Sequence, residues 1–151
     1  MGANYVVRPL DHEMAHWLAQ HGIDCPQGQW GRDPILAEVR AVLGDIPDVR
    51  YHQTVGAAGG GWTIDVIHRT DPANGRWTSI RCSGASTDRA PIAFHKGWPD
   101  LVVEIVHGLT GRTGPLVLFS DTGSTPLPLW PARPLADALS VVKAAWMGDQ
   151  Q

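Results

Sequence analysis

Cysteine, long apolar runs and an excess of charge are all scarce in this 151-residue chain. Its two cysteines, Cys25 and Cys82, allow one disulfide at most, and the sequence does not decide whether they pair. With so few cysteines, reduced thiols and a cytoplasmic location are expected. The longest apolar runs, such as residues 101–103 and 116–119, are too short to cross a membrane. The N-terminus also lacks the apolar stretch of a secretory signal.

The net charge of −3 is too small for strong electrostatic steering. It argues against a nucleic-acid partner, which would usually face a basic surface. Hydrophobic residues make up 43% of the chain and charged residues 18%, a balance typical of a globular protein. Because the chain has no repeat and no long linker, we expect one domain over residues 1–151.

Apolar periodicity and turn residues divide the chain into strands and helices. Strands are expected at residues 5–8, 49–55, 62–69, 76–83, 91–95, 116–120 and 126–130. Helices are expected at residues 12–20, 34–43, 97–109 and 134–146, the second with Asp33 as N-cap and Pro34 as first residue. This order predicts an α+β fold, in which about four helices pack on a mainly antiparallel sheet.

The segment HEMAH, from His12 to His16, matches the zinc-protease pattern H-E-x-x-H. In that pattern His12 and His16 would bind zinc and Glu13 would act as the general base. On a helical wheel the two histidines fall about 160° from the centre of the apolar side, which is formed by Leu10, Met14, Trp17 and Leu18. The histidine pair is therefore expected to face solvent, and a zinc-dependent hydrolase is an alternative function.

The segment DTGS, from Asp121 to Ser124, resembles the active-site loop of aspartic proteases. After Asp121, 30 residues remain (151 − 121), and much of that tail is predicted to be helical, which argues against the flap hairpin and second apolar-Gly segment that such a site needs. The same letters are typical of a turn between two strands, in which Asp121 bonds back to the backbone and Gly123 takes a positive φ. We therefore interpret DTGS as a structural turn.

Seven tryptophans are present, and most are expected in the core. Trp30 lies in a loop rich in glycine and proline, so it is the best candidate for an exposed anchor at a protein interface. Cys82 lies in a predicted strand, and we expect it to be a buried structural residue rather than a nucleophile.

Residues 92–130 combine a strand, a Lys-Gly step, an amphipathic helix and the stretch GPLVLFSDTG before a second strand. This segment resembles the C-terminal half of small bacterial immunity proteins of contact-dependent and polymorphic toxin systems and their uncharacterised relatives. The N-terminal stretch VVRPLDHEMAHWLAQHGI fits the same pattern. The resemblance implies a cytoplasmic α+β domain that binds and blocks one partner protein, such as a toxin encoded by an adjacent gene, without a cofactor.

If the partner is a nuclease toxin with a basic active site, acidic side chains are expected to bind it. The candidates are Asp65, Asp71, Asp88, Asp100 and Asp121. Besides the zinc-dependent hydrolase, a structural or regulatory accessory domain is a further alternative. The sequence defines neither the oligomeric state nor which face of the sheet binds.

Overall fold

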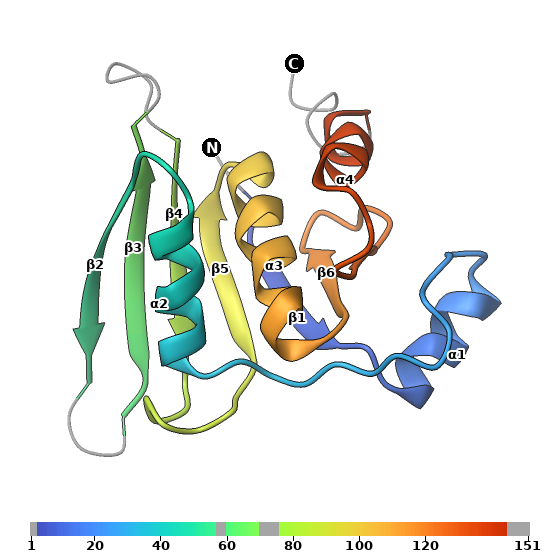
Figure 1. The fold of residues 1–151 in the computed structure, drawn as a ribbon, viewed down its shortest axis with the longest axis horizontal. Helices are drawn as coiled ribbons and strands as arrows, with labels where there is room; N and C mark the ends of the chain where they lie inside the picture. The colour runs from blue at the N-terminus through green and yellow to red at the C-terminus, as the bar shows by residue number, and fades with distance from the viewer. Residues whose placement is uncertain (1–2, 57–59, 70–75, 145–151) are drawn as a thin grey trace.

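The structure is a computed structural model that describes residues 3–56, 60–69 and 76–144 (Figure 1). Its strands are β1 (Tyr5–Pro9), β2 (Val49–Val55), β3 (Trp62–His68), β4 (Arg76–Cys82), β5 (Ile92–Gly97), β6 (Leu116–Ser120) and β7 (Leu127–Leu129). Its helices are α1 (His12–Gln20), α2 (Leu36–Asp45), α3 (Pro99–Thr113) and α4 (Leu135–Val142). The predicted α+β class is confirmed.

All of these strands join one sheet in the order β2-β3-β4-β5-β1-β6-β7, and every neighbouring pair is antiparallel. The strands from β2 to β5 pair in chain order. The N-terminal strand β1 lies inside the sheet, where Tyr5 pairs with Phe94 of β5 and with Ser120 of β6. This order leaves β2 and β7 as the two outer strands.

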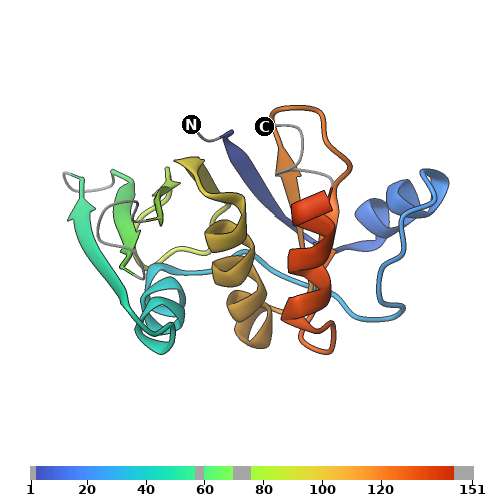
Figure 2. The same cartoon turned by 90° about the horizontal axis from the view of Figure 1, so that it is seen from above.

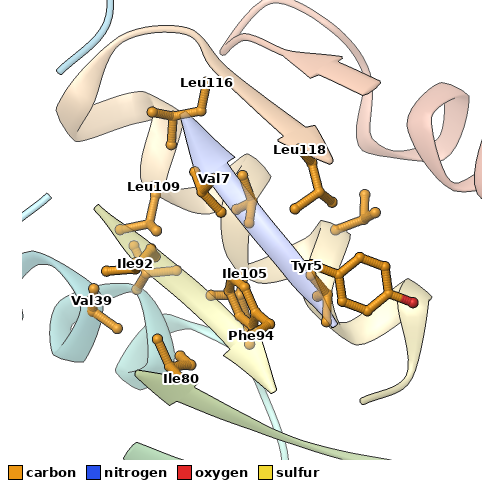
Figure 3. Close-up of a cluster of buried hydrophobic side chains, with 14 of the residues drawn as sticks. Tyr5, Val7, Val39, Ile80, Ile92, Phe94, Ile105, Leu109, Leu116 and Leu118 are labelled. Atoms are coloured by element: carbon orange, nitrogen blue, oxygen red, sulfur yellow. The ribbon is translucent and has the colours of Figure 1, made fainter. Parts of the chain in front are cut away.

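Helices α2, α3 and α4 pack together on one face of the sheet (Figure 2). Strand side chains on that face, such as Val7, Ile80 and Phe94, meet the apolar sides of these helices and form the main core (Figure 3). The central helix is α3, which buries Leu101, Val102, Val103, Ile105, Val106 and Leu109. Within the described part of the chain, no helix is both long enough and apolar enough to cross a membrane.

Helix α1 forms a second, smaller core. Leu10 and Leu18 are buried against Val117 of β6. The neighbours of Val117 in the chain, Leu116 and Leu118, belong to the main core. Because side chains alternate along a strand, Val117 faces the opposite side of the sheet, so α1 packs on the side that the other helices leave uncovered.

The predicted start of α2 is wrong by two residues. The helix begins at Leu36, with Ile35 rather than Asp33 as its N-cap, so Pro34 precedes the helix. The carboxylate of Glu38 accepts a hydrogen bond from the Ile35 backbone N–H at 3.1 Å, which satisfies one of the free donors at this end. An acidic residue three positions into the helix therefore replaces the expected aspartate cap.

The predicted end of α3 is also wrong, because the helix passes through Gly111 and ends at Thr113. Gly114, with φ 81°, is the residue that ends it, and its N–H donates to the carbonyl of Thr110 at 3.0 Å. The last helix, α4, is described to Val142, and the predicted buried residue Trp146 lies outside the described residues.

Glu38 also binds Arg32, in the loop before α2, through two hydrogen bonds of 2.8 and 2.7 Å. The second Arg32 amino group also donates to the carbonyl of Arg112, near the end of α3, at 3.1 Å. The side chain of Glu38 is 14% exposed and that of Arg32 is 34% exposed. This cluster therefore fastens the entry of α2 to the end of α3.

We expect Glu38→Gln to lower the free energy of unfolding at neutral pH by about 1–3 kcal/mol, because the Arg32 guanidinium would lose its charged acceptor. The hydrogen bonds from Arg32 lower the pKa of Glu38 from 4.5. A lowered pKa means that this contribution is complete above pH 4.5 and is lost as the pH falls through the folded-state pKa. Urea titrations at several pH values should therefore show the difference from wild type shrinking in acid.

The matched control is Glu104→Gln on α3, outside this cluster, which should change the free energy of unfolding by no more than about 0.5 kcal/mol. A Glu38→Gln effect that is small at neutral pH, or that grows in acid, would contradict the role given to this ion pair.

Candidate binding face

The side of the sheet opposite α2, α3 and α4 carries no helix over β2 to β5, as far as the described residues extend (Figure 2). Burial alternates along β3, where Ile64 and Val66 are buried while Asp65 and Ile67 are exposed. Strand register then defines the side chains of this surface, which we call the open face: Arg50, His52, Thr54, Thr63, Asp65, Ile67, Trp77, Ser79, Arg81, Ala93 and His95.

An apolar pair lies on the open face. Ile67 of β3 and Trp77 of β4 are directly opposite each other in the ladder, and they are 38% and 45% exposed. On the other side, Ile67 pairs with Arg50 of β2. These side chains border a hollow of about 410 Å³, which His52 and Asp65 also line. A large exposed ring beside an arginine is the composition that protein interfaces use for their strongest contacts.

A polar row crosses the open face beside this pair. His52, Asp65, Ser79 and His95 are successive cross-strand neighbours on β2, β3, β4 and β5. Ser79 is 6% exposed, and its buried hydroxyl has no hydrogen-bond partner. A serine nucleophile needs a histidine within hydrogen-bond distance, and the Ser79 hydroxyl has none, so the row does not form a catalytic triad.

The charge of the open face differs in sign from that of the whole chain. Over β2 to β5 it carries two arginines, Arg50 and Arg81, and one carboxylate, Asp65, which gives +1 with neutral histidines. The complete chain has a net charge of −3. The open face therefore carries a small positive charge on a chain that is acidic as a whole.

A cleft of about 540 Å³ lies beside α1, where residues of α1, β1 and β6 line it. Its polar lining consists of Arg8, Asp11, Glu13 and Asp33. The pKa of Asp33 is raised, because burial disfavours its charged form more than the nearby positive charge of Arg8 favours it. Asp11 is the N-cap of α1 and accepts from the Met14 N–H at 2.8 Å. Three carboxylates against one guanidinium make this cleft acidic.

The two histidines of HEMAH are exposed, as the helical wheel predicted. The ring of His12 lies 4.1 Å from that of Trp30, measured between centroids, and His16 Nε2 lies 3.2 Å from the side-chain nitrogen of Gln20. Glu13 lines the acidic cleft, whereas His12 and His16 are not among the described residues that line it. No three His, Cys, Asp or Glu side chains gather into a metal-binding group within the described ranges. The zinc-hydrolase hypothesis stays a prediction, which metal analysis of untagged protein would test.

Two tryptophans near α1 differ in how they match the predictions. Trp30 is 43% exposed, in agreement with its prediction as an exposed loop residue. Trp17 was expected on the buried side of α1 but is 38% exposed. Its ring lies against His21, at 4.1 Å between centroids, and 6.1 Å from Phe119, so it covers the end of the small core rather than entering it.

The acidic candidates are not brought together. Asp65 is on the open face, and Asp88 is exposed in the loop after β4. Asp100, at the start of α3, forms an ion pair with Arg76 of β4 and so has a structural partner. Asp71 lies outside the described residues. The four described positions do not form the acidic surface that a basic partner would need.

Asp121 fixes the DTGS turn to the N-terminal strand. Its carboxylate accepts a hydrogen bond from the Asn4 N–H at 3.2 Å, and its own N–H donates to the Asn4 carbonyl at 3.0 Å. Gly123 has φ 80°, as expected for the turn that joins β6 to β7. The hydroxyls of Ser120 and Thr122 are 2.8 Å apart. DTGS is therefore a structural turn, as predicted.

The two cysteines are both free thiols. Cys25 is partly buried beside the small core, and Cys82 is buried in the main core. The pKa of each thiol is raised, and the largest cause is burial, which removes the thiol from water. Neither environment favours the thiolate that a cysteine nucleophile requires.

No family model, no curated protein and no solved structure matches this chain.

Proposed function

We propose that this chain is a non-catalytic module of the immunity type, which binds one partner protein and neutralises it through the open face. The observation that carries the proposal is the exposed pair of Trp77 and Ile67 on a sheet surface that no described helix covers. Tryptophan and arginine dominate the energetics of protein interfaces, and Arg50 is the cross-strand neighbour of Ile67. A toxin encoded by an adjacent gene is the partner that we expect.

The electrostatics of the open face refine the choice of partner surface. The carboxylates Asp88, Asp100 and Asp121 lie elsewhere, and Asp65 is the single carboxylate among the open-face side chains of β2 to β5. With Arg50 and Arg81 on the same surface, the contact suits an acidic region of the partner rather than a basic active site. Neutralisation would then work by covering the partner, not by mimicking its nucleic-acid substrate.

Trp77→Ala is expected to weaken the complex with the product of the adjacent gene by about 30-fold or more, because a central interface tryptophan contributes about 2 kcal/mol or more. The measurement is calorimetric titration of the purified full-length chain with that product. Trp30→Ala is the matched control, since Trp77 and Trp30 are 45% and 43% exposed and lie on different parts of the molecule. We expect Trp30→Ala to leave the affinity within about threefold.

Two results would overturn the proposal. If the adjacent gene's product does not bind the wild-type chain, the immunity function fails. If Trp30→Ala weakens binding while Trp77→Ala does not, the open face is not the contact surface.

A further inference from the structure

Among the residues that the structure describes, the outer strand β2 has backbone groups without a partner at alternate positions along its length. Two hydrogen bonds bracket its ladder with β3: Arg69 N–H donates to the Asp48 carbonyl at 3.0 Å, and Gly56 N–H donates to the Gly61 carbonyl at 2.8 Å. Hydrogen-bonded pairs alternate with non-bonded pairs in an antiparallel ladder. The N–H and C=O groups of residues 50, 52 and 54 therefore point toward β3, and those of residues 49, 51, 53 and 55 point away from the sheet.

The two edges of the sheet differ in how they are protected. Strand β7 has three residues, with Pro128 in the middle, which removes a donor and keeps the edge short. Strand β2 has seven residues that pair with β3 without a bulge, and it contains no proline or lysine. It also exposes Tyr51 by 39% and Val55 by 50%. A long, regular edge of this kind is the template onto which another strand adds.

The side chains of β2 define what the added strand must carry. On the helix side it would meet Tyr51 and Val55, which are the cross-strand neighbours of the buried residues Val66 and Trp62. On the open face it would meet Arg50 and His52. An occupant that satisfies both sides alternates apolar side chains with carboxylates. A second copy of β2 contains no Asp or Glu, so it cannot supply the carboxylates.

We propose that the partner protein binds by adding one of its strands to β2, with alternating apolar and acidic side chains. This proposal rests on the protein-binding function proposed above. The added strand would extend the sheet beyond β2, and the carboxylates would lie beside Arg50 at the border of the hollow that Trp77 lines.

The first test uses the full-length chain and a peptide of alternating valine and glutamate, long enough to pair with all of β2. In the free protein, amide hydrogen exchange should be fast at Tyr51 and Gln53 and slow at Arg50, His52 and Thr54. Saturating peptide should slow exchange at Tyr51 and Gln53 by about tenfold. A valine–lysine peptide of the same length is the control and should leave both rates unchanged.

Three results would overturn the proposal. If both peptides protect the Tyr51 and Gln53 amides equally, the added strand does not need acidic side chains. No protection by either peptide up to millimolar concentration would remove strand addition. If the amides of Tyr51 and Gln53 are already protected in the free protein, and this protection grows with protein concentration, a second copy of the chain occupies the edge.

The second test separates this inference from the proposed function. Gln53→Pro removes an outward N–H but keeps the hydrogen bonds of residues 52 and 54 to β3, and Gln53→Ala removes the same side chain but keeps the N–H. Gln53→Pro should weaken binding of the adjacent gene's product by about tenfold relative to Gln53→Ala. If the two variants bind equally, the strand addition fails while the protein-binding function stands. Arg50→Glu should also weaken binding of the adjacent gene's product. This variant tests the same contact even if Gln53→Pro impairs folding.

Discussion

Replacing Phe94 with alanine is expected to lower the free energy of unfolding by about 3–5 kcal/mol. Phe94 lies in the middle of β5 with no exposed surface, and Tyr5 and Ile80 flank it on the neighbouring strands (Figure 3). Its ring fills space between the sheet and the helices, and the surrounding backbone belongs to three paired strands. The cavity left by alanine therefore cannot close by a small local shift.

Urea unfolding followed by far-ultraviolet circular dichroism measures this change. Phe94→Leu should lose less, on the order of 1–2 kcal/mol, because leucine still fills much of the volume. Val141→Ala on α4, at a side chain that is 38% exposed, should stay within about 0.5 kcal/mol of wild type. An effect of Phe94→Ala as small as that of Val141→Ala would contradict the position of Phe94 in the main core.

The same variant separates stability from binding. Phe94 faces the helices, whereas Trp77 is on the open face, so the two side chains act on opposite sides of the sheet. Phe94→Ala should reduce the folded fraction but leave the affinity of the folded molecules unchanged. Trp77→Ala should leave the folded fraction nearly unchanged but lower the affinity, because an exposed side chain contributes little to folding.

Local sequence signals were sufficient for the elements and for the fold class. The helical spacing of Leu101, Val102, Ile105 and Leu109 predicts α3, and the alternation over residues 62–68 predicts a strand with one buried side. The errors lie at the ends of helices and strands, such as β5, which runs from Ile92 to Gly97 rather than over residues 91–95. The start of α2 depends on the contacts of Glu38 with Ile35 and Arg32. Cap preferences alone place the N-cap at Asp33 instead.

The position of β1 could not be predicted from sequence, because a strand of five residues carries no record of which strands flank it. Its insertion between β5 and β6 depends on pairs such as Tyr5 with Phe94 and Val7 with Leu118, which are far apart in the chain. The open face is a consequence of the same long-range packing. Alternation in β3 shows two unlike sides, but only the placement of the helices decides which side they cover.

The exposure of Trp77 shows a limit of sequence reasoning, because most tryptophans are expected in the core and this one is 45% exposed. Trp30 attracts attention because it lies in a loop, while a tryptophan in a strand such as Trp77 is assigned to the core by default. Thr78, Ser79 and Ile80 are all buried, so β4 shows no clean alternation. The register with Ile67 is what places Trp77 on the open face, and that pairing is known only once the strands are assembled. The sequence also does not reveal that Asp100 has a structural partner, because Arg76 comes close to it only when the strands are assembled.

Gly31→Ala is expected to lower the free energy of unfolding by about 3 kcal/mol or more, at the upper end of what overpacking usually costs. Gly31 lies where three segments of the chain meet. Its N–H donates to the Leu10 carbonyl at 2.8 Å, and the Leu10 N–H donates to the Pro115 carbonyl at 3.0 Å. A Cβ at Gly31 would overlap the carbonyl oxygen of Pro115, a main-chain atom that cannot rotate away as a side chain can. The junction must therefore open to accept a methyl group.

Thermal and urea unfolding measure the effect of Gly31→Ala, and Gly111→Ala is the matched control. Gly111 lies inside α3 with nothing within 4 Å of the added Cβ, so alanine there should raise stability by about 0.5–1 kcal/mol. Opposite signs for the same chemical change would show that space, not the loss of glycine, sets the cost at Gly31. If Gly31→Ala were neutral, the hydrogen-bonded junction that holds α1 against the sheet would have to be placed differently.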